Sequence, residues 1–142
     1  MLRATYDTNT LVSGAVTSQG AVSVVIDAWI NDEVDMITSQ SLIEELTRTL
    51  TKPYFRARLT QEQIEAFIDL VITRATVVQI NVPIPKIATH PEDDIVLATV
   101  ISGGASYSVT GDHGLQSLKE FKGIQIVNPV TFTKILQRAR AA

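Results

Sequence analysis

The stretch Leu2-Arg3-Ala4-Thr5-Tyr6-Asp7-Thr8-Asn9 decides how this chain is interpreted, because a short strand pattern ends directly on an acidic side chain. Three more acids stand in comparable places. Glu45 comes shortly after the second strand-like run, Asp94 opens an apolar helix, and Asp112 follows the run that ends in Thr110-Gly111. If these runs are parallel strands of one sheet, their C-terminal ends share the edge where open α/β sheets bind ligands. The sequence therefore predicts four carboxylates at one edge of a sheet.

Four carboxylates gathered at one place repel each other. At ~5 Å separation and an effective dielectric constant of about 20, each pair costs roughly 3 kcal/mol. A bound cation offsets this repulsion, and hard oxygen ligands suit Mg²⁺ or Mn²⁺. The pattern therefore predicts a divalent metal site formed by Asp7, Glu45, Asp94 and Asp112.

Strand and helix patterns alternate along the whole chain. Short strands are expected at residues 2–6, 34–38, 77–80, 105–109 and 124–127. Helices are expected over residues 21–29, 41–51, 60–75, 95–101, 115–119 and 131–140, and only a helical turn and a loop after Asp7. This alternation predicts a mostly parallel sheet covered on both faces, which is a three-layer α/β/α sandwich formed by one domain over residues 1–142.

Composition narrows the class of protein. At 142 residues with 45% hydrophobic side chains, the chain can bury one substantial core. No apolar run approaches the ~20 residues needed to span a membrane. The absence of cysteine excludes disulfides and thiolate metal sites and agrees with a cytoplasmic location. The net charge of −3 argues against a broad basic face for nucleic acid but leaves a metal-dependent nuclease open.

Capping patterns and helix geometry help to separate neighbouring acids. Ser41-x-x-Glu44 and Thr60-x-x-Gln63 match capping boxes, and Thr89-x-x-Glu92 is a third match with Pro91 in the first turn. Glu44 thereby has a structural role at its helix start. Glu45 lies at the border of the apolar stripe of the same helix and is the acid expected to face the sheet edge.

Asp93 and Asp94 are harder to separate. Negative charge in the first turn of a helix is favoured by the helix dipole, so both acids have a structural explanation. Asp94 shares a face with Leu97 and Ala98 and is expected to point inward, where a carboxylate needs a partner. The helix is apolar nearly all round, so periodicity leaves Asp93 open as an alternative ligand.

Several polar and basic residues could support such a site. Asn9 could orient Asp7 or form a turn, while Ser13 and Thr110 could bind phosphate or water or serve only the local backbone. Basic and aromatic residues interleave around Pro53, a composition that suits single-stranded RNA, although a solvated loop between helices is the favoured explanation. The basic residues are Arg48, Lys52, Arg56 and Arg58.

The same blocks resemble the PIN domain, and in particular the VapC-like toxins of toxin–antitoxin systems. The resemblance rests on four blocks that span most of the chain: Asp7-Thr8-Asn9 with Leu11-Val12-Ser13, the segment 42–46 with its Glu, Asp94-x-x-Leu97-Ala98, and Thr110-Gly111-Asp112. It implies an Mg²⁺- or Mn²⁺-dependent endoribonuclease whose family acids fall on Asp7, Glu45, Asp94 and Asp112. One departure is Gly114, where many relatives carry a further Asp, and this leaves open whether one or two ions bind.

The resemblance also implies partners: an RNA substrate, a homodimer and a small antitoxin protein that presents Arg or Lys near the acids. The predicted hairpin of residues 41–51 and 60–75 agrees, because Phe67, Ile68 and Val71 are many apolar side chains for a small sheet to cover. The alternative function is a non-catalytic PIN-like module that binds protein or RNA. A receiver-like domain and a haloacid-dehalogenase-like phosphatase fit less well, because Asp7 has no acidic neighbour and Asn9 replaces the second Asp of the phosphatase.

Overall fold

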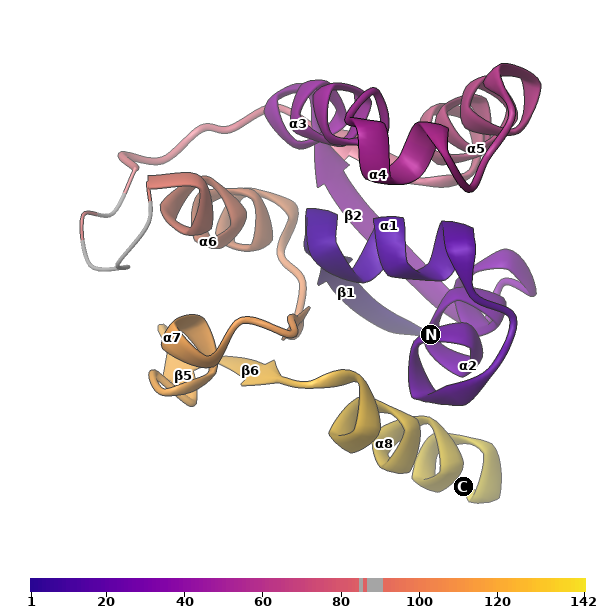
Figure 1. Ribbon diagram of the computed structural model, residues 1–142. Helices are drawn as coiled ribbons and strands as arrows, with labels where there is room; N and C mark the ends of the chain where they lie inside the picture. The colour runs from indigo at the N-terminus through magenta and orange to yellow at the C-terminus, as the bar shows by residue number, and fades with distance from the viewer. Residues whose placement is uncertain (85, 87–90) are drawn as a thin grey trace.

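The computed structural model describes residues 1–84, 86 and 91–142, and their strands form one central sheet with helices on both sides (Figure 1). The elements in chain order are β1 (Leu2–Tyr6), α1 (Thr8–Val16), α2 (Gly20–Ile30), β2 (Val34–Ser39), α3 (Gln40–Leu50), α4 (Pro53–Arg56), α5 (Gln61–Arg74), β3 (Thr76–Val78), α6 (Pro91–Gly103), β4 (Tyr107–Val109), α7 (His113–Gln116), β5 (Glu120–Phe121), β6 (Ile124–Val127) and α8 (Pro129–Ala141).

The strand order is β3-β2-β1-β4-β6-β5, and every pairing is parallel except that of β5 with β6. The chain starts in the middle of the sheet at β1, builds β2 and β3 on one side, and then crosses to build β4 and β6 on the other. The boundary between β1 and β4 is therefore the topological switch point, where open α/β sheets place their ligands. The predicted three-layer α/β/α sandwich with a mostly parallel sheet is confirmed.

Two apolar clusters fill the spaces between the sheet and the helices. Trp29 of α2, Leu46 of α3 and Phe132 of α8 belong to the cluster on one face of the sheet, with Tyr6 of β1. Leu97 of α6 belongs with Leu115 of α7, Ile37 of β2 and Ile126 of β6 to the cluster on the other face. Because both faces are covered, the central strands are buried along most of their length.

The start of α3 differs from the prediction. The residue that caps α3 is Ser39, the last residue of β2, and the predicted capping box of Ser41 and Glu44 does not form. The Ser39 hydroxyl instead makes a hydrogen bond of 2.9 Å with the Thr99 hydroxyl of α6. The strand passes into the helix without a loop, so the capping position falls on a residue that faces another element. Glu44 is exposed and accepts only a 3.5 Å hydrogen bond from Gln40.

The other helix starts follow the sequence more closely. The capping box of α5 is confirmed, because the Thr60 hydroxyl accepts from the Gln63 amide at 3.1 Å and the Gln63 side chain accepts from the Thr60 amide at 2.9 Å. Pro91 begins α6 as expected, while Thr89 lies outside the described residues. The segment after Asp7 is a nine-residue helix, α1, where only one turn was predicted.

In the part of the chain that the structure describes, no single helix is both long and apolar enough to cross a membrane. Among the described helices, only α1 and α2 taken together have the length and apolar composition of a membrane-spanning segment. These two helices are bent against each other by 99°.

Gly103 lets the end of α6 approach the central sheet closely. A Cβ atom at this position would lie 2.2 Å from Cγ2 of Ile37, which is fully buried in β2. We therefore expect Gly103→Ala to lower the free energy of unfolding by roughly 1–3 kcal/mol, the usual range for overpacking a core. Urea denaturation measures this. An unchanged midpoint would mean that Ile37 moves aside without cost and that the α6–β2 contact is looser than described.

Candidate active site

Asp7 lies at the switch point and is held by hydrogen bonds from both neighbouring elements. It caps α1, where Oδ1 accepts from the Thr10 amide at 2.8 Å. Its Oδ2 accepts a hydrogen bond from the Thr110 hydroxyl, which follows β4. Its own amide donates to the Val109 carbonyl at 3.1 Å, so the β1–β4 boundary fixes both its backbone and its side chain.

The protonation of Asp7 reflects this burial. Only 5% of the residue is exposed, and desolvation raises the pKa of its carboxyl group above the ordinary value. The hydrogen bonds from Thr10 and Thr110 act in the opposite direction, and the negative charge of Asp112 raises the pKa further. A cation beside Asp7 would stabilise its charged form against this desolvation and against the charge of Asp112.

A small cavity of about 20 Å³ adjoins Asp7 at the C-terminal edge of the sheet. Glu45 of α3 and Asp93 of α6 line it together with Asp7, so three elements bring one acid each to the same place. Glu44 is exposed on the outer face of α3, so Glu45 is the acid that faces the sheet edge, as the helical geometry predicted. The full lining is Asp7, Thr8, Asn9, Glu45, Asp93 and Val96.

The first turn of α6 carries both remaining candidates for the third acid. Asp94 is 7% exposed and buried against the chain, as its face on the helix predicted, whereas Asp93 is half-buried and lines the cavity. Asp93, Asp94 and Glu45 each take part in an interaction within the structure. Both acids of this turn therefore stay candidates for a ligand, and they are placed differently: one inside the packing and one at the cavity.

Asp112 follows β4 and caps α7. Its Oδ2 accepts from the Leu115 amide at 2.8 Å, and its own amide donates to the Thr110 hydroxyl at 3.0 Å. The Thr110 hydroxyl thus connects the two acids that follow β1 and β4, because it also donates to Asp7. Thr110 positions the acidic residues through these two hydrogen bonds.

The chemistry of the side chains fits a hard divalent cation, because every acid at this edge offers carboxylate oxygen. Across the described residues, however, no three Asp, Glu, His or Cys side chains already converge into a group that could hold a metal ion. Mutual repulsion between carboxylates favours such separation until a cation offsets it. The described part of the site is therefore acidic, with Asp7, Glu45 and Asp93 around one cavity and no three side chains converged on a single point.

Comparison with known proteins gives the family. Residues 3–114 match the family model of the PIN domain, a span that covers β1 through the start of α7 and includes every acid discussed above. The chain belongs to the PIN-domain family. No curated protein matches it in sequence.

Solved structures share the fold of this PIN domain at low sequence identity. PAE2754 from Pyrobaculum aerophilum is 18% identical with a TM-score of 0.62, covering 99% of this chain and 91% of that chain. The DNA-bound VapBC of Salmonella typhimurium is also 18% identical with a TM-score of 0.61, covering 91% and 99%. VapBC2 from Rickettsia felis, bound to a promoter DNA fragment, is 12% identical with a TM-score of 0.59, covering 89% and 98%.

Of the supporting residues predicted for this PIN domain, some lie at the acidic cavity and others lie away from it. Asn9 is exposed at the cavity, while Ser13 is exposed farther along α1 and does not line it. The four predicted RNA-contacting cations lie on α3, on α4 and in the loops beside α4, and none lines the cavity. The Arg58 guanidinium stacks 3.6 Å from the ring centre of Tyr54 and donates to the Tyr54 carbonyl at 2.8 Å, so it already has a structural role.

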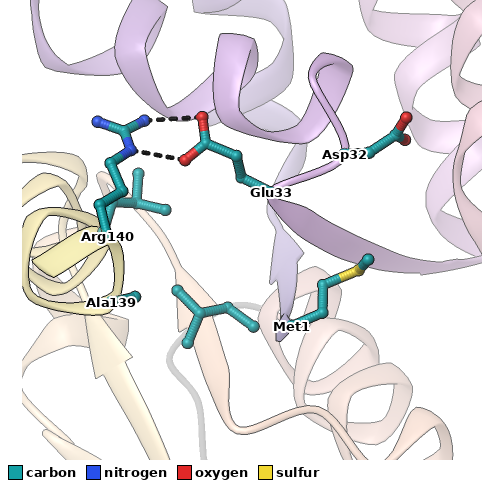
Figure 2. Close-up of a pocket in the computed structure, with 7 residues that line it drawn as sticks. Met1, Asp32, Glu33, Ala139 and Arg140 are labelled. Atoms are coloured by element: carbon teal, nitrogen blue, oxygen red, sulfur yellow. Dashed lines mark hydrogen bonds and ion pairs between the residues drawn. The ribbon is translucent and has the colours of Figure 1, made fainter. Parts of the chain in front are cut away.

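A larger hollow of about 460 Å³ lies at the opposite edge of the sheet, near the starts of β1 and β2 (Figure 2). Arg140 of α8 closes one side of it by donating to both carboxylate oxygens of Glu33, at 2.6 and 3.0 Å. These hydrogen bonds hold the pKa of Glu33 below its ordinary value. Because parallel sheets bind ligands beyond their C-terminal ends, we assign this hollow to the packing of α8 and not to the candidate site.

Sequence patterns missed two residues of the cavity, the apolar Val96 and the polar Thr8. Thr8 is 6% exposed and its hydroxyl group is buried, but its position beside Asp7 gave no sign that other elements would cover it. Only the packing of α3 and α6 across the end of β1 makes it part of the site.

Proposed function

We propose that this PIN domain is a metal-dependent endoribonuclease and the toxin of a toxin–antitoxin pair. The observation that carries the proposal is the position of Asp7, buried at the switch point, raised in pKa, and sharing one cavity with Glu45 and Asp93. The family and the fold shared with the VapBC structures support the same assignment.

The proposed ligands for Mg²⁺ or Mn²⁺ are Asp7, Glu45, Asp112 and an acid from the first turn of α6, where Asp94 is the residue that the family resemblance indicates. These residues would hold the cation, which would supply Lewis-acid chemistry toward a water molecule and the phosphate of the RNA. The protein itself fixes the positions of the acidic side chains. Thr110 holds Asp7 and Asp112 in fixed relation, and the β1–β4 boundary keeps Asp7 from turning away.

A second function has one observation in its favour. The acidic side chains do not converge into a ready metal group among the described residues, which agrees with a non-catalytic PIN-like module that binds protein or RNA. Calorimetric titration with Mn²⁺ separates the two. A saturable site that weakens in Asp7→Asn supports the nuclease, and the absence of any saturable binding supports the module.

The surface of α5 bears on the proposed partners. Val71 is fully buried in the chain's own core and Phe67 and Ile68 are partly buried, so the hairpin packs on its own sheet more completely than its composition predicted. Ile72 is still 47% exposed. Between α1 and α5 lies an open, largely apolar groove of about 310 Å³, lined by Ala15, Leu59, Gln63, Ala66, Phe67 and Leu70.

We expect this groove and the neighbouring α5 surface to be shared with another chain, in a homodimer or in a complex with a small antitoxin. Light scattering at tens of micromolar should give a dimer mass, or a larger complex when the product of an adjacent small gene is added. Replacing Phe67 with Ser should weaken the association, because an apolar contact is lost. A monomer that the added protein leaves unchanged would contradict the expectation.

A further inference from the structure

Three buried hydroxyl groups have no hydrogen-bond partner among the described residues: those of Thr5, Thr8 and Ser108. Thr5 and Ser108 are paired neighbours in β1 and β4, inside the sheet. Thr8 is different, because it also lines the acidic cavity. A buried hydroxyl without a partner is unfavourable, and when it persists at a site it points to a bound water, ion or ligand.

Neither helix capping nor a hydrogen bond within α1 explains why position 8 carries a hydroxyl group. Thr8 is the first residue of α1, and the capping hydrogen bond at this helix is made by Asp7 to the Thr10 amide. A threonine in the middle of a helix can bond to the carbonyl one turn earlier, but the first residue of α1 has no such helical carbonyl behind it. Valine has nearly the same shape and would fill the same space without burying a polar atom.

The size of the cavity indicates what could satisfy this hydroxyl. A polar cavity needs roughly 10–15 Å³ to hold one water molecule. The cavity beside Thr8 measures about 20 Å³, so it has room for one water and little more. A small cation at such a site usually keeps part of its hydration shell, and those waters need hydrogen-bond partners in the protein.

We propose that Thr8 is a positioning residue whose hydroxyl holds one water molecule in this cavity, and that the water belongs to the hydration shell of a divalent cation bound by the surrounding acids. This inference rests on the proposed metal-dependent function. The hydroxyl accepts a hydrogen bond from that water, which gives Thr8 the partner that it lacks among the described residues. Thr8 thereby fixes the orientation of the water toward Asp7, its neighbour in sequence.

The test compares variants of the full chain that differ by one hydroxyl or one methyl group. Mn²⁺ titration calorimetry is run on the wild type, Thr8→Val and Thr8→Ser, and on Thr5→Val as the matched control, since Thr5 is also an unpartnered buried hydroxyl but does not line the cavity. Thermal unfolding of the same proteins in EDTA reports stability without metal.

We expect Thr8→Val to raise the Mn²⁺ dissociation constant roughly tenfold or more, the effect usual for losing a group that orients a metal ligand. Thr8→Ser should keep binding close to the wild type because it retains the hydroxyl, and Thr5→Val should bind like the wild type. In EDTA, Thr8→Val should melt at or above the wild-type temperature, since it removes a buried unpartnered hydroxyl. A purely structural threonine would not combine weaker metal binding with undiminished stability.

Two results would overturn the inference in distinguishable ways. Unchanged Mn²⁺ affinity in Thr8→Val, with binding intact in the wild type, removes the role of Thr8 and leaves the proposed nuclease standing. No Mn²⁺ binding by the wild type removes both. If Thr8→Val does not fold, Thr8→Ala is used in its place and judged by the same affinity criterion, because its smaller side chain cannot clash in the cavity.

Discussion

Asp7→Asn is expected to abolish RNA cleavage and to leave the folded protein at least as stable as the wild type. Asparagine caps helices about as well as aspartate, so the start of α1 is retained. The lost carboxylate is the proposed central ligand, and even groups that only orient ligands change activity 10–100-fold. We therefore expect activity to fall by roughly 100-fold or more. Cleavage of a defined RNA in Mn²⁺ buffer measures this.

The difference in stability between Asp7→Asn and the wild type should depend on pH in a definite direction. Burial raises the pKa of Asp7 in the folded protein. The stability that Asp7 contributes is therefore fully present below its unfolded pKa, near 3.9, and is lost as the pH rises through the folded pKa. Asparagine does not titrate. In EDTA, the free energy of unfolding of the variant should therefore rise relative to that of the wild type between about pH 4 and neutral pH. Urea denaturation of both proteins at about pH 4 and at neutral pH measures this difference. A variant whose free energy of unfolding falls relative to the wild type over that range would contradict the burial described for Asp7.

Glu45→Gln should reduce RNA cleavage far more than Glu44→Gln. The two residues are neighbours in α3 and their substitutions are chemically identical, so each serves as the control for the other. Glu45 lines the acidic cavity, whereas Glu44 is exposed and makes only a weak hydrogen bond to Gln40. Removing the charge of Glu45 removes a proposed ligand, while Glu44→Gln should change stability by less than about 0.5 kcal/mol, as is usual for surface substitutions.

Both variants are compared with the wild type by initial cleavage rates in Mn²⁺ and by urea denaturation. Inactivation by Glu44→Gln with normal activity in Glu45→Gln would show that α3 presents its other face to the substrate. The proposed ligand set would then lose its α3 member.

The sequence predicted the edge of the sheet well because the physical signals there are local. The strand 2–6 ends on Asp7, and the strand alternation with helices forces a parallel sheet whose ends meet, so the position of Asp7 beside Thr110 and Asp112 followed from the pattern. The orientation of Glu45 toward the sheet edge followed from its angular position on an amphipathic helix.

Features that depend on contacts between distant elements were missed. The start of α3 was misplaced because Ser39 bonds to Thr99, sixty residues away, instead of leaving the capping role to Ser41. The length of α1 was underestimated because its sequence contains Gly14. That glycine permits close packing on α2, where a Cβ atom would lie 2.3 Å from Cγ1 of Ile26.

The choice between Asp93 and Asp94 as the acid from α6 shows what helical periodicity cannot predict. The face that Asp94 shares with Leu97 and Ala98 predicted that it points inward, but α6 is buried on nearly all sides, so its sequence carries no polar face that would settle the orientation of Asp93. The structure places Asp94 in the packing and Asp93 at the cavity, which is a tertiary result. Thr8 was missed for the same reason, since its burial depends on helices that come later in the chain.

The most direct test of the proposed function is cleavage of total RNA by the purified wild-type protein, with fragment ends mapped by sequencing. We predict discrete cleavage with Mg²⁺ or Mn²⁺, complete loss with EDTA, recovery when Mn²⁺ is added back in excess, and no cleavage by Asp7→Asn prepared in the same way. Cleavage that persists in EDTA, or that Asp7→Asn retains at the wild-type rate, would contradict a metal-dependent ribonuclease centred on Asp7.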